Sequence, residues 1–326
     1  MRVFLTGGTG LLGSHLAHEL RLHGHEVVAL HRKEADTLFL EETECSLVEG
    51  DIRDDAEVLS PLMAGCSHVV HGAALIYAGS AWPRVRAVNV DGTRNVLTAA
   101  RLAGAQHAVH LSSVAVYGDA TPPIDESTPT DSDLPPGDLY ARSKREAEEV
   151  ARGIEEKRGF PVTILRPSAV YGERDRLMAP ALARILRLPL VPLLGPARNA
   201  LPVVYAGNVS VAIRLAMEAG RGGTTYDIGL DHSLNQRDLM RWLAAGLGLS
   251  PRFCTLPAPL VRGGAAILAK VGVGAPGARH LPINRLTHLA LGENPFRSER
   301  VRTEFGWEPP HGHKDALERT GKSLLR

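Results

Sequence analysis

The first fifteen residues constrain the fold more than any other part of the chain. Residues 3–5 form an apolar run that is too short for a helix and predicts a buried strand. Leucines then recur at helical spacing, at positions 11, 12, 16 and 20, so a helix should begin near Gly10. Gly7, Gly10 and Gly13 lie between the two elements. Because such a turn aims free backbone N–H groups and the positive helix end at one point, it indicates a pyrophosphate site, although glycines can also serve a turn alone. A P-loop is excluded, since Ser14 stands where the phosphate lysine would be.

Further short apolar runs alternate with helical patterns along the first half of the chain. They cover residues 26–31, 47–49, 68–71, 107–111 and 162–166. This alternation with short loops predicts an α/β fold with a doubly wound parallel sheet of the Rossmann type. Runs at 203–205 and 225–228 are expected to return to that sheet. We therefore expect a dinucleotide-binding domain of residues 1–168 plus 203–228, and a smaller, mainly helical C-terminal substrate-binding lobe of residues 169–202 plus 229–326.

The composition of the chain limits the class of protein, its partners and its compartment. The chain is 44% hydrophobic and 22% charged with a net charge of +1, which is ordinary for a soluble globular protein and gives no strong field for nucleic acid or anionic membranes. The three cysteines, Cys45, Cys66 and Cys254, form no CxxC pair and fit a reducing cytoplasm, where we expect the protein to reside without a leader. The apolar stretch 256–275 contains two prolines and two basic residues, so we expect a packed helix and no stable membrane insertion.

The ends of three predicted strands suggest how a dinucleotide would be held. His31 is followed by Arg32 and Lys33, without a carboxylate for a ribose, so NADP is favoured and NAD is the alternative. Arg32 could equally be a solvated loop charge. Asp51 could accept from an adenine amino group or simply form a turn. Ala73 and Ala74 follow residues 68–71, and such small residues let a cofactor approach.

A tyrosine and a lysine supply the chemistry. Tyr140 and Lys144 are four apart on a predicted helix that Asp138 can cap, so their side chains share one face. A free tyrosine has a pKa of about 10, and a nearby ammonium lowers it, which makes the phenol a usable proton donor and acceptor. Ser113, at the end of strand 107–111, can hydrogen-bond the reacting oxygen. The alternative is an ordinary surface pair, but none of the other tyrosines has a lysine four residues on.

Several motifs together resemble the extended short-chain dehydrogenase/reductase superfamily, also called the NAD-dependent epimerase/dehydratase family. They are residues 6–13 (TGGTGLLG), 50–52 (GDI), 71–74 (HGAA), 89–95 (NVDGTRN), 112–118 (SSVAVYG), Tyr140-x3-Lys144 and 165–172 (LRPSAVYG). The resemblance implies that Ser113, Tyr140 and Lys144 are catalytic. We expect no metal site, because the sequence has no H-E-x-x-H motif and His311-x-His313 lacks a third ligand. The resemblance also implies a cofactor site formed by Gly7, Thr9, Gly10, Leu11, Leu12, Gly13, Arg32, Asp51, Ile52, Ala73, Ala74, Asn89, Ser112, Tyr140, Lys144, Pro167 and Val170.

Within this superfamily the pattern is similar to the 3β-hydroxysteroid dehydrogenase and dihydroflavonol reductase branch. Ser168 and Ala169 stand where enzymes of nucleotide sugars often carry an asparagine, and residues 205–209 read YAGNV in place of a VDDV-like segment. We expect an oxidoreductase that interconverts a secondary alcohol and a ketone on an apolar small molecule. A nucleotide-sugar epimerase or dehydratase, and a non-catalytic dinucleotide sensor, are the alternatives. A homodimer is possible, but this expectation rests only on analogy with the family. The pair His311 and His313 is expected to lie in a solvated loop.

Overall fold

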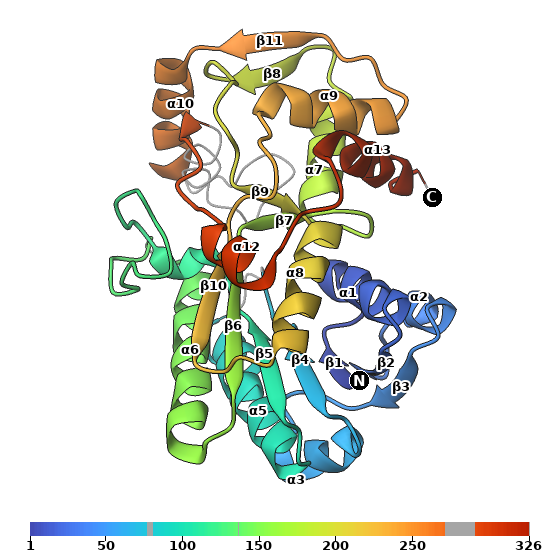
Figure 1. The fold of residues 1–326 in the computed structure, drawn as a ribbon. Coiled ribbons are helices and arrows are strands. Elements are labelled where there is room, and N and C mark those ends of the chain that lie inside the picture. The colour runs from blue at the N-terminus through green and yellow to red at the C-terminus, as the bar shows by residue number, and fades with distance from the viewer. Residues whose placement is uncertain (77–80, 136, 271–290, 326) are drawn as a thin grey trace. The chain divides into compact units, whose positions relative to one another are not determined.

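The computed structural model describes residues 1–76, 81–135, 137–270 and 291–325, which fold into two compact units (Figure 1). Unit 1 comprises Met1–Ser168, Ala206–Ile228 and Phe296–Glu308. Unit 2 comprises Ala169–Tyr205, Gly229–Pro295 and Pro309–Arg326.

Unit 1 is built on a seven-stranded parallel sheet with the order β10-β6-β5-β4-β1-β2-β3. The strands are β1 (Arg2–Thr6), β2 (Glu26–His31), β3 (Ser46–Glu49), β4 (His68–His71), β5 (His107–Leu111), β6 (Val162–Pro167) and β10 (Thr224–Ile228). Most of their central residues are buried and apolar, as expected for a parallel sheet that is covered on both faces, whereas those of the edge strand β3 are half-buried. The doubly wound α/β fold predicted from the sequence is confirmed.

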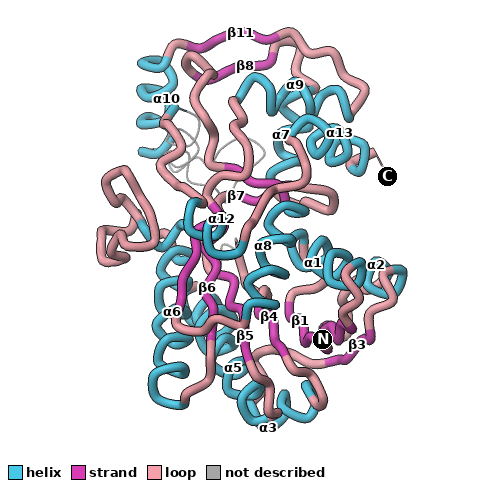
Figure 2. Tube along the Cα trace, viewed as in Figure 1, coloured by secondary structure: helices cyan, strands magenta, loops and turns pink. Residues whose placement is uncertain are grey.

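Helices cover both faces of this sheet (Figure 2). On one face α1 (Leu11–Leu22) packs against α8 (Ala206–Ala219), and on the other α5 (Gly92–Leu102) packs against α3 (Ala56–Leu59) and α6 (Leu139–Arg158). The predicted helix around residues 83–103 consists of α4 (Trp82–Arg86), a π-helical turn η2 (Ala87–Asp91) and α5. The shorter elements of unit 1 are α2 (Leu38–Glu42), η1 (Ser60–Met63), η3 (Val114–Tyr117) and α12 (Glu299–Phe305).

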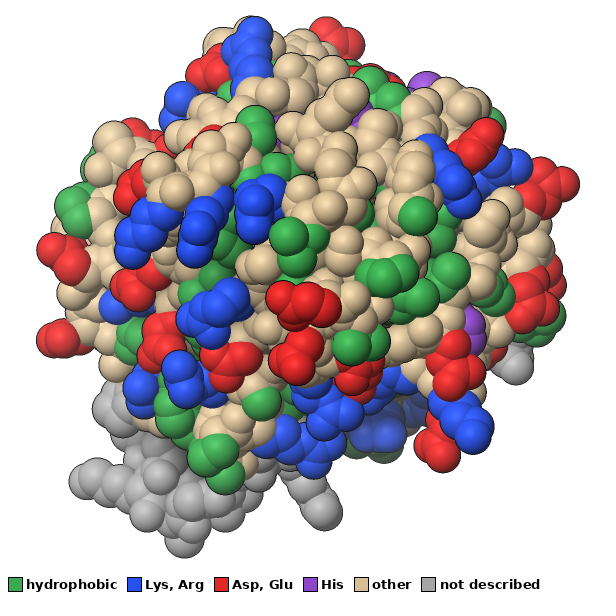
Figure 3. Space-filling view, turned by 90° about the horizontal axis from the view of Figure 1, so that it is seen from below, with side chains coloured by type: hydrophobic (Ala, Val, Ile, Leu, Met, Phe, Trp, Pro, Cys, Tyr) green, Lys and Arg blue, Asp and Glu red, His purple; other side chains and the backbone are tan. Residues whose placement is uncertain are grey.

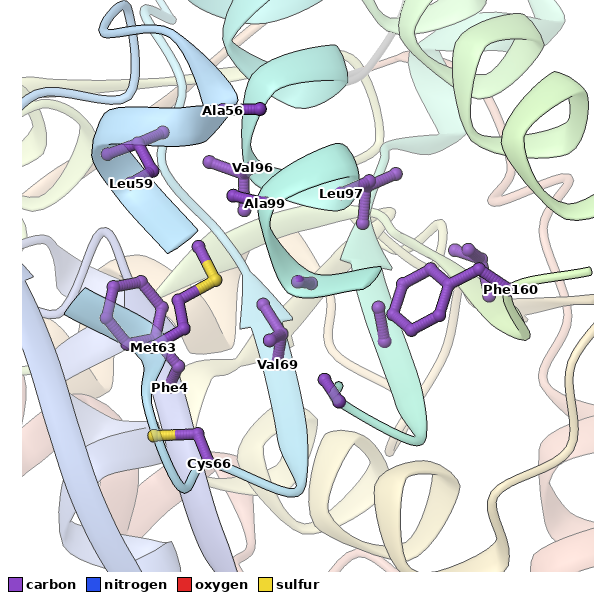
Figure 4. Close-up of a cluster of buried hydrophobic side chains, with 14 of the residues drawn as sticks. Phe4, Ala56, Leu59, Met63, Cys66, Val69, Val96, Leu97, Ala99 and Phe160 are labelled. Atoms are coloured by element: carbon purple, nitrogen blue, oxygen red, sulfur yellow. The ribbon is translucent and has the colours of Figure 1, made fainter. Parts of the chain in front are cut away.

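The core under α3, α5 and α6 is apolar and closely packed. Figure 4 shows Phe4 and Val69 of the sheet facing Met63, Leu97 and Phe160, and all five side chains are buried. Burying each such side chain contributes about 1.5–3 kcal/mol. This core holds the carboxyl ends of the strands in fixed positions, and those ends carry the candidate site.

Unit 2 has two small parallel sheets and its own apolar core. In one sheet β7 (Ala169–Tyr171) pairs with β9 (Val203–Tyr205), and in the other β8 (Val191–Leu194) pairs with β11 (Phe253–Leu256). Its helices are α7 (Met178–Leu186), α9 (Gln236–Gly246), α10 (Ala258–Lys270) and α13 (His313–Ser323). Within the described ranges, no helix combines the length and apolarity needed to span a bilayer. Residues 271–275 of the apolar stretch lie outside the described residues.

Three expectations about the second half of the chain need revision. Residues 203–205 form a strand but do not return to the large sheet, because their partner is β7. His313 is buried and not solvated, since its ring lies 2.7 Å from the Tyr171 hydroxyl and 3.2 Å from the Asp231 carboxylate. Residues 296–308 group with unit 1, because the Phe305 ring packs 4.5 Å from that of Tyr226 and Trp307 Nε1 donates to Asn208 O.

Candidate active site

The Gly-rich turn joins β1 to α1 in the way the sequence predicts. Gly7 has φ +79°, and a Cβ there would lie 2.7 Å from the backbone nitrogen of Ala73. At Gly13 a Cβ would collide with Gly7 O, so helix and turn can approach this closely only without side chains. The first intrahelical bond runs from Ser14 N to Gly10 O, which leaves the amides of residues 11–13 directed out of the helix end. These donors and the positive helix end fit a pyrophosphate.

The strand register brings four predicted segments to one edge of the sheet. Thr6 aligns with His71, His71 with His110, and Leu111 with Leu165, so the parallel strands end side by side. The segments that follow contain Gly7 and Thr9, Ala73 and Ala74, Ser112 and Ser113, and Pro167. Gly10, Leu11 and Leu12 begin α1 at the same edge and are exposed or half-buried. The carboxyl edge of an open parallel sheet is where such folds bind ligands.

Arg32 and Asp51 follow the neighbouring strands β2 and β3. The Asp51 carboxylate accepts from Arg53 Nε at 3.0 Å and from Arg53 Nη2 at 2.7 Å. The hydrogen bonds to Arg53 are the main reason why the pKa of Asp51 is lowered, and the charge of Arg32 lowers it further. Arg32 itself is exposed. Two guanidinium groups therefore stand by this carboxylate, and the sequence analysis recognised only Arg32.

Ile52 and Asn89 are placed inside unit 1. Ile52 is buried in the core cluster, and its carbonyl accepts from Asn95 Nδ2. Asn89 Oδ1 accepts from Leu75 N at 2.7 Å, and its Nδ2 donates to Leu75 O and to the Ser143 hydroxyl. The Asn89 amide thus ties the segment after β4 to helix α6. Val170 lies on β7 in unit 2, so its role towards a cofactor remains a prediction.

Helix α6 carries the predicted catalytic pair. Its N-terminus is capped by Asp138, whose carboxylate accepts from Ala141 N at 2.9 Å. Lys144 is buried and its Nζ donates to Leu111 O at 2.7 Å. This bond holds α6 against the end of β5, two residues before Ser113. Lys144 Nζ lies 5.9 Å from the centroid of the Tyr140 ring, so the two side chains share one face of the helix as predicted.

Burial lowers the pKa of Lys144. Desolvation lowers the pKa of Lys144 to about 8, against the opposing effect of the Glu148 carboxylate one turn later. Tyr140 and Ser113 are both half-buried and therefore accessible to a ligand. Ser113 also begins the short turn η3, where its hydroxyl accepts from Ala115 N at 3.2 Å.

A buried ion pair behind the lysine was missed by the sequence analysis. Glu148 accepts from Arg166 Nε at 2.8 Å and Nη2 at 2.6 Å, and also from Arg152. Burial would raise the pKa of Glu148, but the hydrogen bonds and charge of Arg166 lower it below its usual value. The signal was present in the spacing, because Lys144, Glu148 and Arg152 recur every four residues on one helix face.

Arg166 extends this network to strand β10. Its Nη1 donates to the Tyr117 hydroxyl at 2.7 Å, and that hydroxyl donates to Asp227 Oδ2. Burial raises the pKa of Asp227 to about 7. Among the described residues, no group of three or more His, Cys, Asp or Glu side chains is arranged to hold a metal ion.

Known proteins resemble this chain along most of its length. The profile of the NAD dependent epimerase/dehydratase family matches residues 3–229. A 4-hydroxy-2-methyl-3-oxo-4-farnesyl-3,4-dihydroquinoline-1-oxide ketoreductase from Stigmatella aurantiaca is 29% identical over 98% of this chain and 95% of its own. A 3 beta-hydroxysteroid dehydrogenase/Delta 5-->4-isomerase from Mycobacterium tuberculosis is 29% identical over 97% and 88%. The dTDP-glucose 4,6-dehydratase DesIV from Streptomyces venezuelae, solved with NAD, has a TM-score of 0.73 at 26% identity and covers 100% of this chain and 97% of its own.

Proposed function

Because the chain belongs to the NAD dependent epimerase/dehydratase family, we propose that it interconverts a secondary alcohol and a ketone on an apolar small molecule. The observation that carries the proposal is the buried Lys144 ammonium, which is anchored at the end of β5 beside Tyr140. Unit 1 is proposed to bind the dinucleotide and unit 2 the substrate.

A dinucleotide fits the residues at the sheet edge. The amides of residues 11–13 and the close approach at Gly7 and Gly13 suit a pyrophosphate, and neither glycine tolerates a Cβ. When bound, the nicotinamide supplies or accepts the hydride, whereas the protein must move the proton.

Tyr140 is the proposed proton donor and acceptor. The Lys144 ammonium favours the phenolate of Tyr140, so the phenol can give a proton to the ketone oxygen in reduction and take it back in oxidation. Ser113, whose hydroxyl already accepts a backbone hydrogen bond, retains its own proton to donate to the same oxygen. The Glu148 carboxylate, which Arg166 holds in place, favours the charged form of Lys144.

NADP is the proposed preferred cofactor. Arg32 is exposed at the end of β2, and its charge reaches Asp51 at the end of β3. A guanidinium there can pair with a 2′-phosphate, whereas NAD prefers a carboxylate. Ligand binding to the folded protein raises its melting temperature, so NADP should raise it more than NAD. The substitution Arg32→Asp should reverse this order, and a parent protein that NAD stabilises more would contradict the assignment.

An apolar ketone is the proposed substrate class. The two relatives named above act, by their names, on a farnesylated oxo compound and on a steroid. The test is consumption of reduced cofactor with a 3-ketosteroid and with a long-chain alkyl ketone. Tyr140→Phe should abolish the consumption, whereas the cofactor should still raise the melting temperature of the variant.

A nucleotide-sugar reaction is the second candidate, favoured by the likeness to the dehydratase DesIV. Turnover of dTDP-glucose without net oxidation of added cofactor would support it. In that case neither ketone should be reduced. Retention of the cofactor without turnover of any of these compounds would favour a non-catalytic sensor.

A further inference from the structure

The chain contains two long stretches without acidic residues, and most of their residues lie in unit 2. The chain has 36 Asp and Glu among 326 residues, yet none occurs in residues 176–217 or 239–292. At the average density, a stretch as long as the second would hold about six. The basic residues are retained in both, among them Arg184, Arg187, Arg252 and Arg262. The net charge of +1 therefore conceals a strong regional segregation.

The fold of unit 2 brings parts of these stretches together. Strands β8 and β11 pair in parallel with Val191 opposite Phe253, and Val191 N donates to Arg252 O at 2.8 Å. The residues before the two strands, including Leu190 and Arg252, therefore lie side by side. At the other end of the pair, Gly195 N donates to Leu256 O, and α10 begins two residues later. Figure 1 draws this sheet and α10 at the top of the view.

Leucines are exposed around this small sheet. Leu188 and Leu190 are 49% and 53% exposed before β8, and Leu256 and Leu260 are 38% and 69% exposed at the end of β11 and on α10. By contrast, Val191 and Leu193 are fully buried against the unit 2 core, so the sheet has one inner face and one outer side. We call Arg187, Leu188, Leu190, Arg252, Leu256 and Leu260 the leucine–arginine surface.

Acidic side chains do not neutralise this surface from within its own segments. Asp238 bounds the second stretch at the start of α9, and its carboxylate lies 3.7 Å from Arg241. The face in Figure 3 is different, because basic and acidic side chains are interspersed there. Exposed leucines beside cationic guanidinium groups suit a lipid bilayer, which has an anionic surface and an apolar interior.

We propose that the leucine–arginine surface docks unit 2 reversibly onto an anionic lipid bilayer. The leucines enter the boundary between headgroups and acyl chains, while the arginines pair with lipid phosphates. This is peripheral binding and requires no spanning helix. It goes beyond the proposed reaction and does not depend on it. The surface would place the enzyme where apolar molecules concentrate.

Co-sedimentation of the full chain with lipid vesicles tests the proposal. The protein should sediment with vesicles rich in phosphatidylglycerol and much less with pure phosphatidylcholine, and 0.5 M salt should weaken the binding because salt screens exposed charges. The double substitution Arg187→Gln and Arg252→Gln should lower the affinity about fivefold for each arginine. Leu190→Glu with Leu260→Glu should lower it at least tenfold.

Leu22→Glu is the matched control, because Leu22 on α1 of unit 1 is also 69% exposed. It should bind vesicles like the parent, and all variants should keep the parent's melting temperature. Failure of the parent to sediment with anionic vesicles would overturn the proposal. So would equal binding to both lipids, or full binding by the leucine variant. A change of oligomeric state in the leucine variant alone, without loss of lipid binding, would instead identify the surface as a subunit contact.

Discussion

Replacing Lys144 by methionine should abolish activity without weakening the fold. The Lys144 ammonium is buried and donates to Leu111 O, and desolvation lowers its pKa from 10.5 to about 8. A methionine fills a similar volume without a charge. The substitution should reduce turnover by at least about a hundredfold, since general acid–base catalysis contributes that much and depends on the ammonium.

The lowered pKa of Lys144 gives the expected change in the free energy of unfolding. Because the folded-state pKa lies below the usual one, the unfolded chain binds more protons between pH 8 and 10.5, and stability from this group rises with pH in that window. Below pH 8 the buried charge costs about 3 kcal/mol. Leaving Leu111 O without its donor costs the variant about 1–3 kcal/mol. Lys144→Met should therefore be at least as stable as the parent at pH 7.

Urea unfolding at pH 7 and pH 9.5 measures this directly. The parent should gain about 2 kcal/mol from Lys144 between the two values, and the variant should lack that gain. The control is Lys157→Met near the end of the same helix, where Lys157 is exposed. A Lys144→Met protein that is several kcal/mol less stable at pH 7, or that shows the parent's pH dependence, would refute the reasoning.

Three further substitutions probe the Gly-rich turn, helix α6 and the buried network. Gly13→Ala should destabilise unit 1 by about 1–3 kcal/mol and eliminate the cofactor-induced melting shift, because a Cβ would collide with Gly7 O. Gly153→Ala on α6, where a Cβ meets nothing within 4 Å, should stabilise by about 0.5–1 kcal/mol, and equal effects of the two would contradict this. Asp227 has a pKa raised to about 7, so the folded chain binds more protons between pH 4 and 7 and the parent loses stability as pH rises through that window. Asp227→Asn, which can still accept from Tyr117, should remove this dependence in denaturant titrations, and an unchanged pH profile would refute it.

Local sequence signals located the parts of the site that depend on local structure. Residues 26–31, 68–71 and 107–111 are the strands predicted, and Asp138 begins α6 as predicted, because strand periodicity and helix capping are set by neighbours in sequence. The alignment of strand ends then followed from the parallel topology.

Long-range partners were not predictable in this way. Residues 203–205 have a strand-like composition whether they pair with β6 or with β7, so their placement needed the structure. His313 is adjacent to Gly312 and looked solvated, but Tyr171 and Asp231 lie 142 and 82 positions away in the chain. Glu148 similarly owes its burial to Arg166, which lies on a strand.

The role of Tyr140 in hydride and proton transfer is tested most directly by deuterium transfer from the cofactor, measured with and without the Tyr140 hydroxyl. With nicotinamide cofactor deuterated at the transferred position, the parent should deliver deuterium to the carbinol carbon of the reduced ketone. Tyr140→Phe should still bind the cofactor, through the Gly-rich turn and the other residues at the sheet edge, and form no labelled alcohol. Label transfer by the Phe variant at the parent's rate would contradict the central role given to Tyr140, as would an alcohol formed by the parent without deuterium.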